Sequence, residues 1–393
     1  MTRTDRTAHR TRGFTESVIR EMTRVANEHG ALNLAQGFPD FPCPEVLKEA
    51  ACAAIRADVN QYAVTWGAPR LRRAIAASYG RWYGMEVDEA AEVTVTCGAT
   101  EAMASALMSV IDPGDEVLVF EPFYENYGPD AILCGAAPIW IPLPIEATLD
   151  PDRLEAAVTP RTRAIVLNSP NNPTGRVFAR AELESIADLC RRHDLIAFTD
   201  EIYEHILYEG SHIPLVTLPG MRARTVTVSG ASKTFSITGW RVGWIVAPPD
   251  LTGAIRKVHD FLTVGAPAPL QEGVAAALES LGDDYYAGLA AGYRERRDVL
   301  VPALQAAGFH CRPPAGAYYV LADFSDLSDL DDDAFARWLA AGADGRLERG
   351  VAPVPGSSFF HEPAMGRGLV RFAFCKRVAT LVDAGEQLRR LGR

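Results

Sequence analysis

A lysine of this sequence follows directly after a strand-like run, in surroundings that suit nucleophilic chemistry. Lys233 lies in S-G-A-S-K-T-F, just behind the apolar run T-V-T-V-S of residues 225–229. Desolvation by small and apolar neighbours lowers the pKa of a lysine and makes its amine a better nucleophile. A single lysine is usually a solvated surface charge, but this position predicts one that faces a ligand. A Walker-type phosphate loop is excluded, because Gly-Lys-Ser/Thr does not occur at the required spacing.

Two further charged residues are associated with apolar strands. Asp200 ends the run L-I-A-F-T-D, and Arg371 interrupts L-V-R-F-A-F. A carboxylate that closes a buried strand needs a cation or hydrogen-bond donors, although a cap on the next turn explains Asp200 equally well. An arginine inside an apolar strand is typical of bidentate anion binding. A salt bridge on an edge strand would give Arg371 the same pattern.

Two turns could hold the remaining parts of a ligand. C-G-A-T-E (97–101) lies where a strand gives way to a helix, and free N–H groups at such a helix start suit a phosphate. N-S-P-N-N-P-T-G (168–175) forms a rigid turn that can hold a side-chain amide in place. Each signal alone also fits an ordinary junction or surface turn. Taken with the lysine, the carboxylate and the arginine, they match what pyridoxal phosphate chemistry on an amino acid requires.

The elements that must position these residues alternate along the chain. We expect strands over 92–97, 116–120, 139–143, 164–168, 196–199, 225–229 and 244–247, with helices over 99–110, 179–193 and 251–262. This alternation predicts an α/β domain with a mostly parallel, buried sheet, whose ligands gather at the carboxyl ends of strands. The pattern changes at about Tyr285 and predicts a smaller α+β domain. We expect a long helix there to residue 307, strands over 318–322 and 369–374, and a closing helix over 379–391. We expect a cleft between the two.

Composition narrows the class of protein. The chain has 393 residues, of which 48% are hydrophobic and 23% charged, with a net charge of −11. The length predicts two or three domains, and the acidic balance argues against nucleic acid or an anionic membrane as the main partner. The seven cysteines are widely scattered without a C-x-x-C pair, which predicts reduced thiols and no metal site. We recognise no secretory signal or bilayer-spanning run, so we expect a cytoplasmic protein.

Over nearly its whole length the chain resembles the class I/II, fold-type I aminotransferases, which depend on pyridoxal 5′-phosphate. It is most similar to the subgroup of kynurenine/glutamine aminotransferases, cysteine-conjugate β-lyases and succinyl-diaminopimelate aminotransferases. Eight motifs carry the resemblance: N-L-A-Q-G-F-P-D-F-P (33–42), N-Q-Y (60–62), C-G-A-T-E (97–101), E-P-F-Y-E-N-Y (121–127), N-S-P-N-N-P-T-G (168–175), T-D-E-I-Y (199–203), S-K-T-F-S-I-T-G-W-R-V-G (232–243) and V-R-F-A-F (370–374).

The resemblance implies a fold and a domain division. A large domain of residues 45–288 would carry the mostly parallel seven-stranded sheet and bind pyridoxal 5′-phosphate. Residues 1–44 and 289–393 would form a small α+β domain with an N-terminal arm. Two such chains would form a homodimer with shared active sites, whose small-molecule partners are an amino acid and a 2-oxo acid.

The resemblance also implies a role for each matching residue. Lys233 would hold the cofactor as a Schiff base and move a proton, and Asp200 would keep the pyridine nitrogen protonated. Tyr203 and Asn172 would bind the ring 3-hydroxyl, and Tyr124 would stack on the ring face. The phosphate would be bound by Ala99, Thr100 and Arg241, and Tyr62 would reach the phosphate in the neighbouring subunit. Arg371 would bind the substrate carboxylate, in a pocket that Gly37 and Asn172 also line.

The implied reaction is transfer of an amino group from an α-amino acid to a 2-oxo acid by a ping-pong route. The alternative is β- or γ-elimination or replacement on an amino acid, which the motifs do not separate from transfer.

Two departures from the family pattern bear on the site. Gly230 stands where many members have a phosphate-binding serine, for which Ser229 or Ser232 could substitute. Val264 and Gly265 stand where the kynurenine/glutamine enzymes carry an aromatic–histidine pair, which predicts a roomier side-chain pocket.

Overall fold

A seven-stranded sheet forms the centre of the larger part of the protein, in a computed structural model that describes residues 6–391. The strand order is β2-β8-β7-β6-β5-β3-β4. The strands are β2 (Val93–Thr96), β3 (Glu116–Glu121), β4 (Ala137–Pro142), β5 (Thr162–Asn168), β6 (Ile196–Asp200), β7 (Thr225–Gly230) and β8 (Gly243–Val246). Strand β8 is antiparallel to both its neighbours, and the other pairs are parallel. The predicted mostly parallel seven-stranded sheet is confirmed.

This topology brings the carboxyl ends of six strands to one edge. Because β8 runs against both β2 and β7, β2 points in the same direction as the parallel set. The register places Asn168 beside Asp200, and Asp200 beside Val228. The residues that follow these strands therefore meet at the same edge, as is usual for ligand sites of such sheets.

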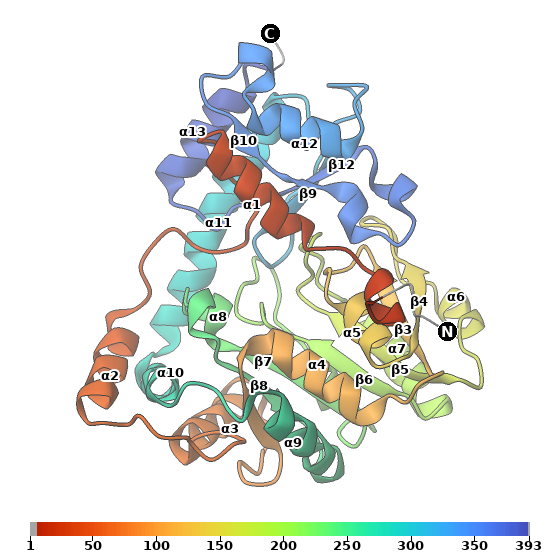
Figure 1. Ribbon diagram of the computed structural model, residues 1–393, viewed down its shortest axis with the longest axis vertical. Helices are drawn as coiled ribbons and strands as arrows, with labels where there is room; N and C mark the ends of the chain where they lie inside the picture. The colour runs from red at the N-terminus through yellow and green to blue at the C-terminus, as the bar shows by residue number, and fades with distance from the viewer. Residues whose placement is uncertain (1–5, 392–393) are drawn as a thin grey trace.

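Helices cover both faces of the sheet (Figure 1). On one face pack α4 (Gly98–Val110), α5 (Tyr127–Leu133) and α9 (Pro249–Thr263), and on the other α6 (Pro151–Ala156) and α7 (Arg180–Arg192). Apart from the edge strand β4, which is only partly buried, the strands are consequently buried on both sides, which explains their continuous apolar runs. Helices α2 (Glu45–Arg56), α3 (Pro69–Tyr83) and α10 (Ala268–Ser280) pack beside β2 and β8 through a separate core cluster. The short α8 (Ala231–Thr234) directly follows β7.

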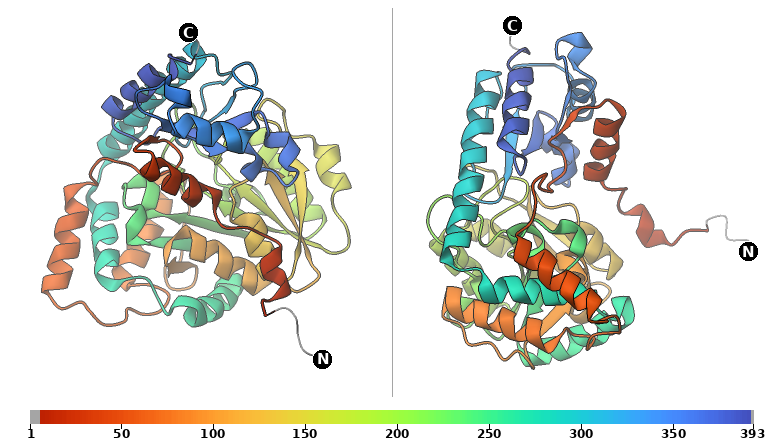
Figure 2. Two further views of the ribbon diagram at one scale, coloured as in Figure 1. Left: turned by 45° about the horizontal axis from the view of Figure 1, so that its top comes forward. Right: turned by 90° about the vertical axis from the view of Figure 1, so that its left-hand side faces the viewer.

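The smaller part is built on a three-stranded antiparallel sheet in the order β11-β12-β9. Its strands are β9 (Tyr319–Asp323), β11 (Val354–Pro355) and β12 (Leu369–Ala373), and its helices are α1 (Val18–Glu28), α12 (Asp332–Ala340) and α13 (Val378–Leu388). A short parallel pair, β1 (Leu32–Asn33) with β10 (Val351–Ala352), attaches the N-terminal segment to this part. Helix α11 (Asp283–Ala306) extends from α10 to the smaller sheet (Figures 1 and 2).

The remaining helical segments are short 3₁₀ turns. They are η1 (His9–Arg12), η2 (Leu215–Thr217), η3 (Thr238–Trp240), η4 (Ala343–Gly345), η5 (Gly356–Phe359) and η6 (Pro363–Gly366). The predicted domain boundary between residues 288 and 289 falls inside the continuous helix α11, and the division stays a prediction. No helix within residues 6–391 is long and apolar enough to cross a membrane.

Candidate active site

A cavity of about 420 Å³ lies at the carboxyl edge of the large sheet, next to the smaller part of the protein. Its lining includes ten of the predicted site residues: Gly37, Ala99, Thr100, Tyr124, Asn172, Asp200, Tyr203, Lys233, Arg241 and Arg371. The eleventh, Tyr62, is not part of this lining and is 86% exposed. Its expected contact is with a second subunit, so that contact stays a prediction.

Lys233 reaches from α8 toward the N-terminal segment. Its Nζ donates a hydrogen bond to the carbonyl oxygen of Gly37 at 3.2 Å. Burial lowers the pKa of Lys233 to about 8, which leaves a large share of the amine neutral near that pH. Position 37 must be a glycine here, because a Cβ would lie 2.0 Å from the hydroxyl oxygen of Tyr319. The lysine is thus a desolvated amine, as its surroundings in the sequence predict.

Asp200 lies at the end of β6 and is held by two donors. The hydroxyl of Tyr127 donates to Oδ2 at 2.7 Å, and the backbone N–H of Ile202 donates to Oδ1 at 3.2 Å. Burial raises the pKa of Asp200, although these donors oppose the shift. No cation among residues 6–391 forms an ion pair with this carboxylate. A bound ligand with a protonated nitrogen would therefore be stabilised beside it.

Arg371 is a buried cation of the cavity without a carboxylate partner among residues 6–391. Its side chain is fully buried at 0% exposure. The Nη1 group donates to Oδ1 of Asn172 at 2.7 Å, Nη2 donates to the carbonyl oxygen of Ala35 at 2.6 Å, and Nε has no partner. Within the described residues no carboxylate pairs with it, which is costly for a buried cation. A ligand carboxylate would supply the missing charge.

The start of α4 and Arg241 form an anion cradle. Gly98 opens the helix with φ +81°, and a Cβ there would lie 2.2 Å from Nη2 of Arg241. The first N–H groups of a helix have no partner within it, so those of Ala99 and Thr100 are available to a phosphate. Arg241 donates only to carbonyl oxygens, those of Thr238 at 3.1 Å and Cys97 at 3.4 Å.

The structure explains why position 230 is a glycine and not the phosphate-binding serine of many family members. A Cβ on Gly230 would lie 2.9 Å from Cα of Gly243, so a serine there would crowd the start of β8. Of the two serines considered as substitutes, Ser229 donates to Oε1 of Glu204 at 2.6 Å, away from the cavity. Ser232 lines the cavity and is the one available to a ligand.

Several cavity residues were not identified from the sequence. Besides Tyr127, they include Ser17, Arg20, Gln36, Glu125, Asn168 and Tyr319. Tyr127 lies within the quoted motif 121–127, but it is 73 positions from Asp200 and only the fold joins them. Phe14 of the N-terminal segment lines an adjoining groove rather than this cavity. Val264 and Gly265 do not line the cavity of their own chain, so the roomier pocket stays a prediction.

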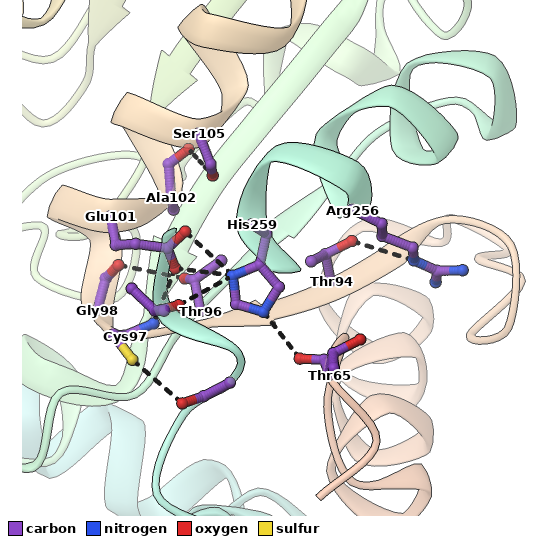
Figure 3. A network of polar contacts seen from close by, with 12 residues as sticks. Thr65, Thr94, Thr96, Cys97, Gly98, Glu101, Ala102, Ser105, Arg256 and His259 are labelled. Carbon is purple, nitrogen blue, oxygen red and sulfur yellow. Dashed lines mark hydrogen bonds and ion pairs between the residues drawn. The ribbon is translucent and has the colours of Figure 1, made fainter. Parts of the chain in front are cut away.

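A buried histidine connects the anion cradle to the segment that carries Tyr62 (Figure 3). In His259, Nδ1 lies 3.0 Å from Oε1 of Glu101 in the first turn of α4, and Nε2 lies 2.8 Å from the carbonyl oxygen of Thr65. Both partners are acceptors, so the ring makes both contacts as a donor only when both of its nitrogens carry a proton, as in the imidazolium. Glu101 in turn accepts from the backbone N–H of Cys97 at 3.0 Å.

Comparison with known proteins gives the family. The family model described as aminotransferase class I and II matches residues 29–379. The probable N-succinyldiaminopimelate aminotransferase DapC of Mycobacterium tuberculosis is 41% identical over 97% of this chain and 98% of its own. Human kynurenine–oxoglutarate transaminase 1 is 36% identical over 94% of each chain. The solved structure of the mycobacterial N-succinyldiaminopimelate aminotransferase superposes with a TM-score of 0.93, covering 98% of this chain and 100% of that one.

The fold and the site define a fold-type I transferase. The chain belongs to the class I and II aminotransferase family and is an aminotransferase, which transfers an amino group to a 2-oxo acid. Members of this family use pyridoxal 5′-phosphate. The described residues fit that group: an anion cradle without a carboxylate, a desolvated amine and a buried carboxylate without a cation surround one cavity.

The His259 pair predicts a pH-dependent contribution to stability. Burial lowers the pKa of His259, but the hydrogen bond and the charge of Glu101, with Asp260 adding to them, outweigh burial and raise it. The contribution is therefore fully present below the unfolded pKa of about 6.5 and is lost as pH rises through the folded pKa. His259→Gln should cost about 1.5–3 kcal/mol at pH 6. Thermal unfolding of both proteins from pH 5.5 to 9.5 should show their difference shrink as pH increases.

The exposed pair of His310 with Asp326 provides the matched control. His310→Gln should change the unfolding midpoint little at any pH, because solvent screens such a pair. A constant difference between wild type and His259→Gln across the pH range would contradict an imidazolium at position 259.

Proposed function

We propose that this chain is a homodimeric, cytoplasmic aminotransferase that binds pyridoxal 5′-phosphate and exchanges amino groups between an α-amino acid and a 2-oxo acid by a ping-pong route. One observation supports this most strongly. A desolvated lysine amine, a buried carboxylate and a fully buried arginine without a carboxylate line the same cavity. Each of these three groups lacks a partner of the kind that the cofactor and an amino acid would supply.

The cofactor-binding roles follow those that the resemblance to the family implies for the matching residues. Arg241, Ser232 and the first N–H groups of α4 bind the phosphate. Asp200 holds a proton on the ring nitrogen, and Tyr127 keeps the carboxylate oriented through its 2.7 Å hydrogen bond. The cofactor, when bound, supplies an electron-accepting ring conjugated to the substrate. Tyr203 and Asn172 bind the ring oxygen, and Tyr124 covers the ring face and excludes water.

Lys233 carries the proton transfer. Because burial lowers the pKa of Lys233 to about 8, a share of its Nζ would be neutral and could hold the cofactor covalently. When free, the same amine would move the proton between Cα of the substrate and C4′ of the cofactor. The carbonyl oxygen of Gly37, 3.2 Å from Nζ, keeps the amine near this path.

Arg371 orients the substrate. Its planar guanidinium binds the α-carboxylate by two parallel hydrogen bonds, a geometry that an ammonium group does not reproduce. Asn172 accepts from Nη1 at 2.7 Å, and its own backbone N–H donates to Asn168 at 2.8 Å. This chain of contacts fixes the fork before substrate arrives, so that less side-chain entropy is lost on binding.

An exposed apolar surface beside the anion cradle supports the formation of a dimer with a second copy of the chain. Two of its residues are almost fully exposed, Tyr62 at 86% and Phe261 at 91%. Three others are nearly half exposed: Val64 at 42%, Leu262 at 45% and Val264 at 43%. The 2.8 Å contact between Thr65 and His259 holds the two segments that carry them together. Apolar residues gathered in this way favour a protein interface, through which Tyr62 reaches the partner's phosphate site.

Lys233→Ala should abolish turnover while the chain still binds the cofactor loosely. Removal of a group that acts as general base typically costs roughly 10²–10⁴-fold, and here the covalent attachment is lost as well. Turnover and the visible absorbance of the cofactor are the measurements. The exposed Lys257→Ala should leave both unchanged. Borohydride reduction and peptide mapping that label a different lysine would refute the assignment.

Arg371→Lys should weaken the reaction with amino acids but not cofactor binding. Hydrogen bonds to charged groups are worth about 1.5–3 kcal/mol each, so loss of the fork should lower kcat/KM by at least about tenfold. Amines without a carboxylate should be poor substrates of the wild type and should be little affected by the change. If they react with the wild type as well as amino acids do, Arg371 has another role.

Hybrid dimers test whether Tyr62 acts across subunits. Tyr62→Ala and Lys233→Ala homodimers should each have low activity. A hybrid of one Tyr62→Ala and one Lys233→Ala chain should regain about half of the wild-type activity, because one of its sites then contains both residues. Purified hybrids that stay as inactive as the parent proteins would rule out the shared site.

A further inference from the structure

One tyrosine of the cavity has no part in the proposed function. Tyr319 begins β9, lines the cavity and is 3% exposed. In the smaller sheet it is paired with Ala373 of β12, two positions from Arg371 (Figure 1). Residues two positions apart in a strand point to the same face, so Tyr319 and Arg371 lie on one face of this sheet. The guanidinium of Arg371 lies 4.3 Å from the ring centroid of Tyr319.

The hydroxyl of Tyr319 contacts the hydroxyl of Tyr203 across the boundary between the two parts of the protein. The two oxygens lie 2.9 Å apart, and either can donate to the other. The rings are nearly perpendicular, at 87°, with centroids 5.8 Å apart. Because Tyr203 follows β6 of the large sheet, this contact joins the residue assigned to the cofactor ring with the residue that lies against Arg371.

The backbone of Gly37 fixes the position of the Tyr319 hydroxyl. A Cβ at position 37 would lie 2.0 Å from this oxygen and 2.8 Å from the ring carbon that carries it. With Arg371 on the face of the ring, Gly37 beside the hydroxyl and Tyr203 bonded to it, the phenol has little freedom to move. A donor that is held in place before the ligand arrives loses less entropy on binding.

Both phenols keep their protons near neutral pH. Burial raises the pKa of Tyr319 to about 12 and that of Tyr203 well above its usual range. The pair therefore has two protons, of which only one lies between the two oxygens. When Tyr203 donates to a ligand oxygen, its own oxygen must accept from Tyr319 to keep the contact of 2.9 Å. Hydrogen bonds in series strengthen one another, because each polarises the next.

We propose that Tyr319 is a positioning residue, which donates to Tyr203 and so strengthens the hydrogen bond from Tyr203 to the ring oxygen of the cofactor. The inference rests on the proposed function, because that function supplies the ring oxygen. A stronger donor stabilises negative charge on this oxygen and lowers the proton affinity of the bound cofactor. The ring of Tyr319 has a second role, since its face stabilises the guanidinium that binds the α-carboxylate.

The substitution Tyr319→Phe tests the hydroxyl alone, since it keeps the ring and every charge around it. The ionisable groups that face the two hydroxyls from the neighbouring elements are Asp200, Lys233, Arg371, Tyr124, Tyr318 and Cys375. Tyr319→Leu removes the ring as well.

Tyr208→Phe is the matched control. Tyr208 is also 3% exposed, and its hydroxyl donates to the carbonyl oxygen of Ala317, just before β9 and outside the cavity lining. The control therefore removes one buried hydrogen bond from the same segment without touching Tyr203. Thermal unfolding of the apoproteins should show similar, small decreases in the midpoint for Tyr208→Phe and Tyr319→Phe.

The absorbance of the bound cofactor as a function of pH is the main measurement. Tyr319→Phe should move the midpoint of this titration to higher pH by about 0.3 or more, which is a twofold change in proton affinity, and Tyr203→Phe should move it further. In the Tyr203→Phe background, Tyr319→Phe should add nothing, because the hydroxyl through which it acts is absent. Tyr208→Phe should leave the midpoint unchanged.

Steady-state kinetics separate the two roles of Tyr319. Tyr319→Phe should lower kcat and keep KM for an amino acid within about twofold, since the ring against Arg371 is still present. Tyr319→Leu should also raise KM at least about fivefold, because the guanidinium then loses the aromatic face beside it.

The outcomes separate the two levels of the argument. An unchanged midpoint in Tyr319→Phe, an equal shift in Tyr208→Phe, or a further shift when Tyr319→Phe is added to Tyr203→Phe overturns the role of Tyr319, while the proposed function stands. A wild type that binds no pyridoxal 5′-phosphate overturns the proposed function, and the role of Tyr319 with it.

Discussion

The burial of cations without internal counter-charges is the constraint on which the site depends. Arg371 is fully buried, its hydrogen bonds within the described part of the chain go only to an amide oxygen and a carbonyl oxygen, and its guanidinium lies 4.3 Å from the ring centroid of Tyr319. Burial also holds the pKa of Lys233 at about 8. A fold that keeps such groups without carboxylates is less stable than it could be. The cost is offset when anionic groups of a ligand occupy the cavity, so stability and ligand binding are linked.

Close approach of backbone segments is what allows these cations to converge. Gly37 leaves space for the hydroxyl of Tyr319, Gly98 for the guanidinium of Arg241, and Gly243 for the backbone of Gly98, where a Cβ would lie 2.5 Å from its carbonyl carbon. Each contact joins segments that are far apart in the sequence. A side chain at any of the three positions would displace a charged group or the strand behind it, and the geometry of the site would be lost.

The sequence predicted the parts of the fold that have a strong local pattern. All seven strands of the large sheet lie where apolar runs end in turn residues, and α4, α7, α9 and α11 lie where helical periodicity is clear. The positions of Asp200 and Lys233 at the cavity, just after strands, were predictable for the same reason. The direction of β8 was not, because nothing local distinguishes an antiparallel strand within a buried sheet. Nor were the contacts of Tyr127 with Asp200 or of Ser17 with Glu125, which join distant segments.

Both parts of the protein line the cavity that contains the candidate site residues. Gly37 and Arg371 come from the segments around the smaller sheet, while Lys233 and Asn172 follow strands of the larger one. The hydrogen bonds of 3.2 Å from Lys233 to Gly37 and of 2.7 Å from Arg371 to Asn172 cross between these parts, as does that of Ser17 with Glu125. A ligand held by Arg371 of the smaller part and by Lys233 and Asp200 of the larger part would contact both parts at once. Its binding energy would then favour the packed arrangement in which the lysine is correctly placed, because a ligand shifts a conformational equilibrium by its differential affinity for the two states.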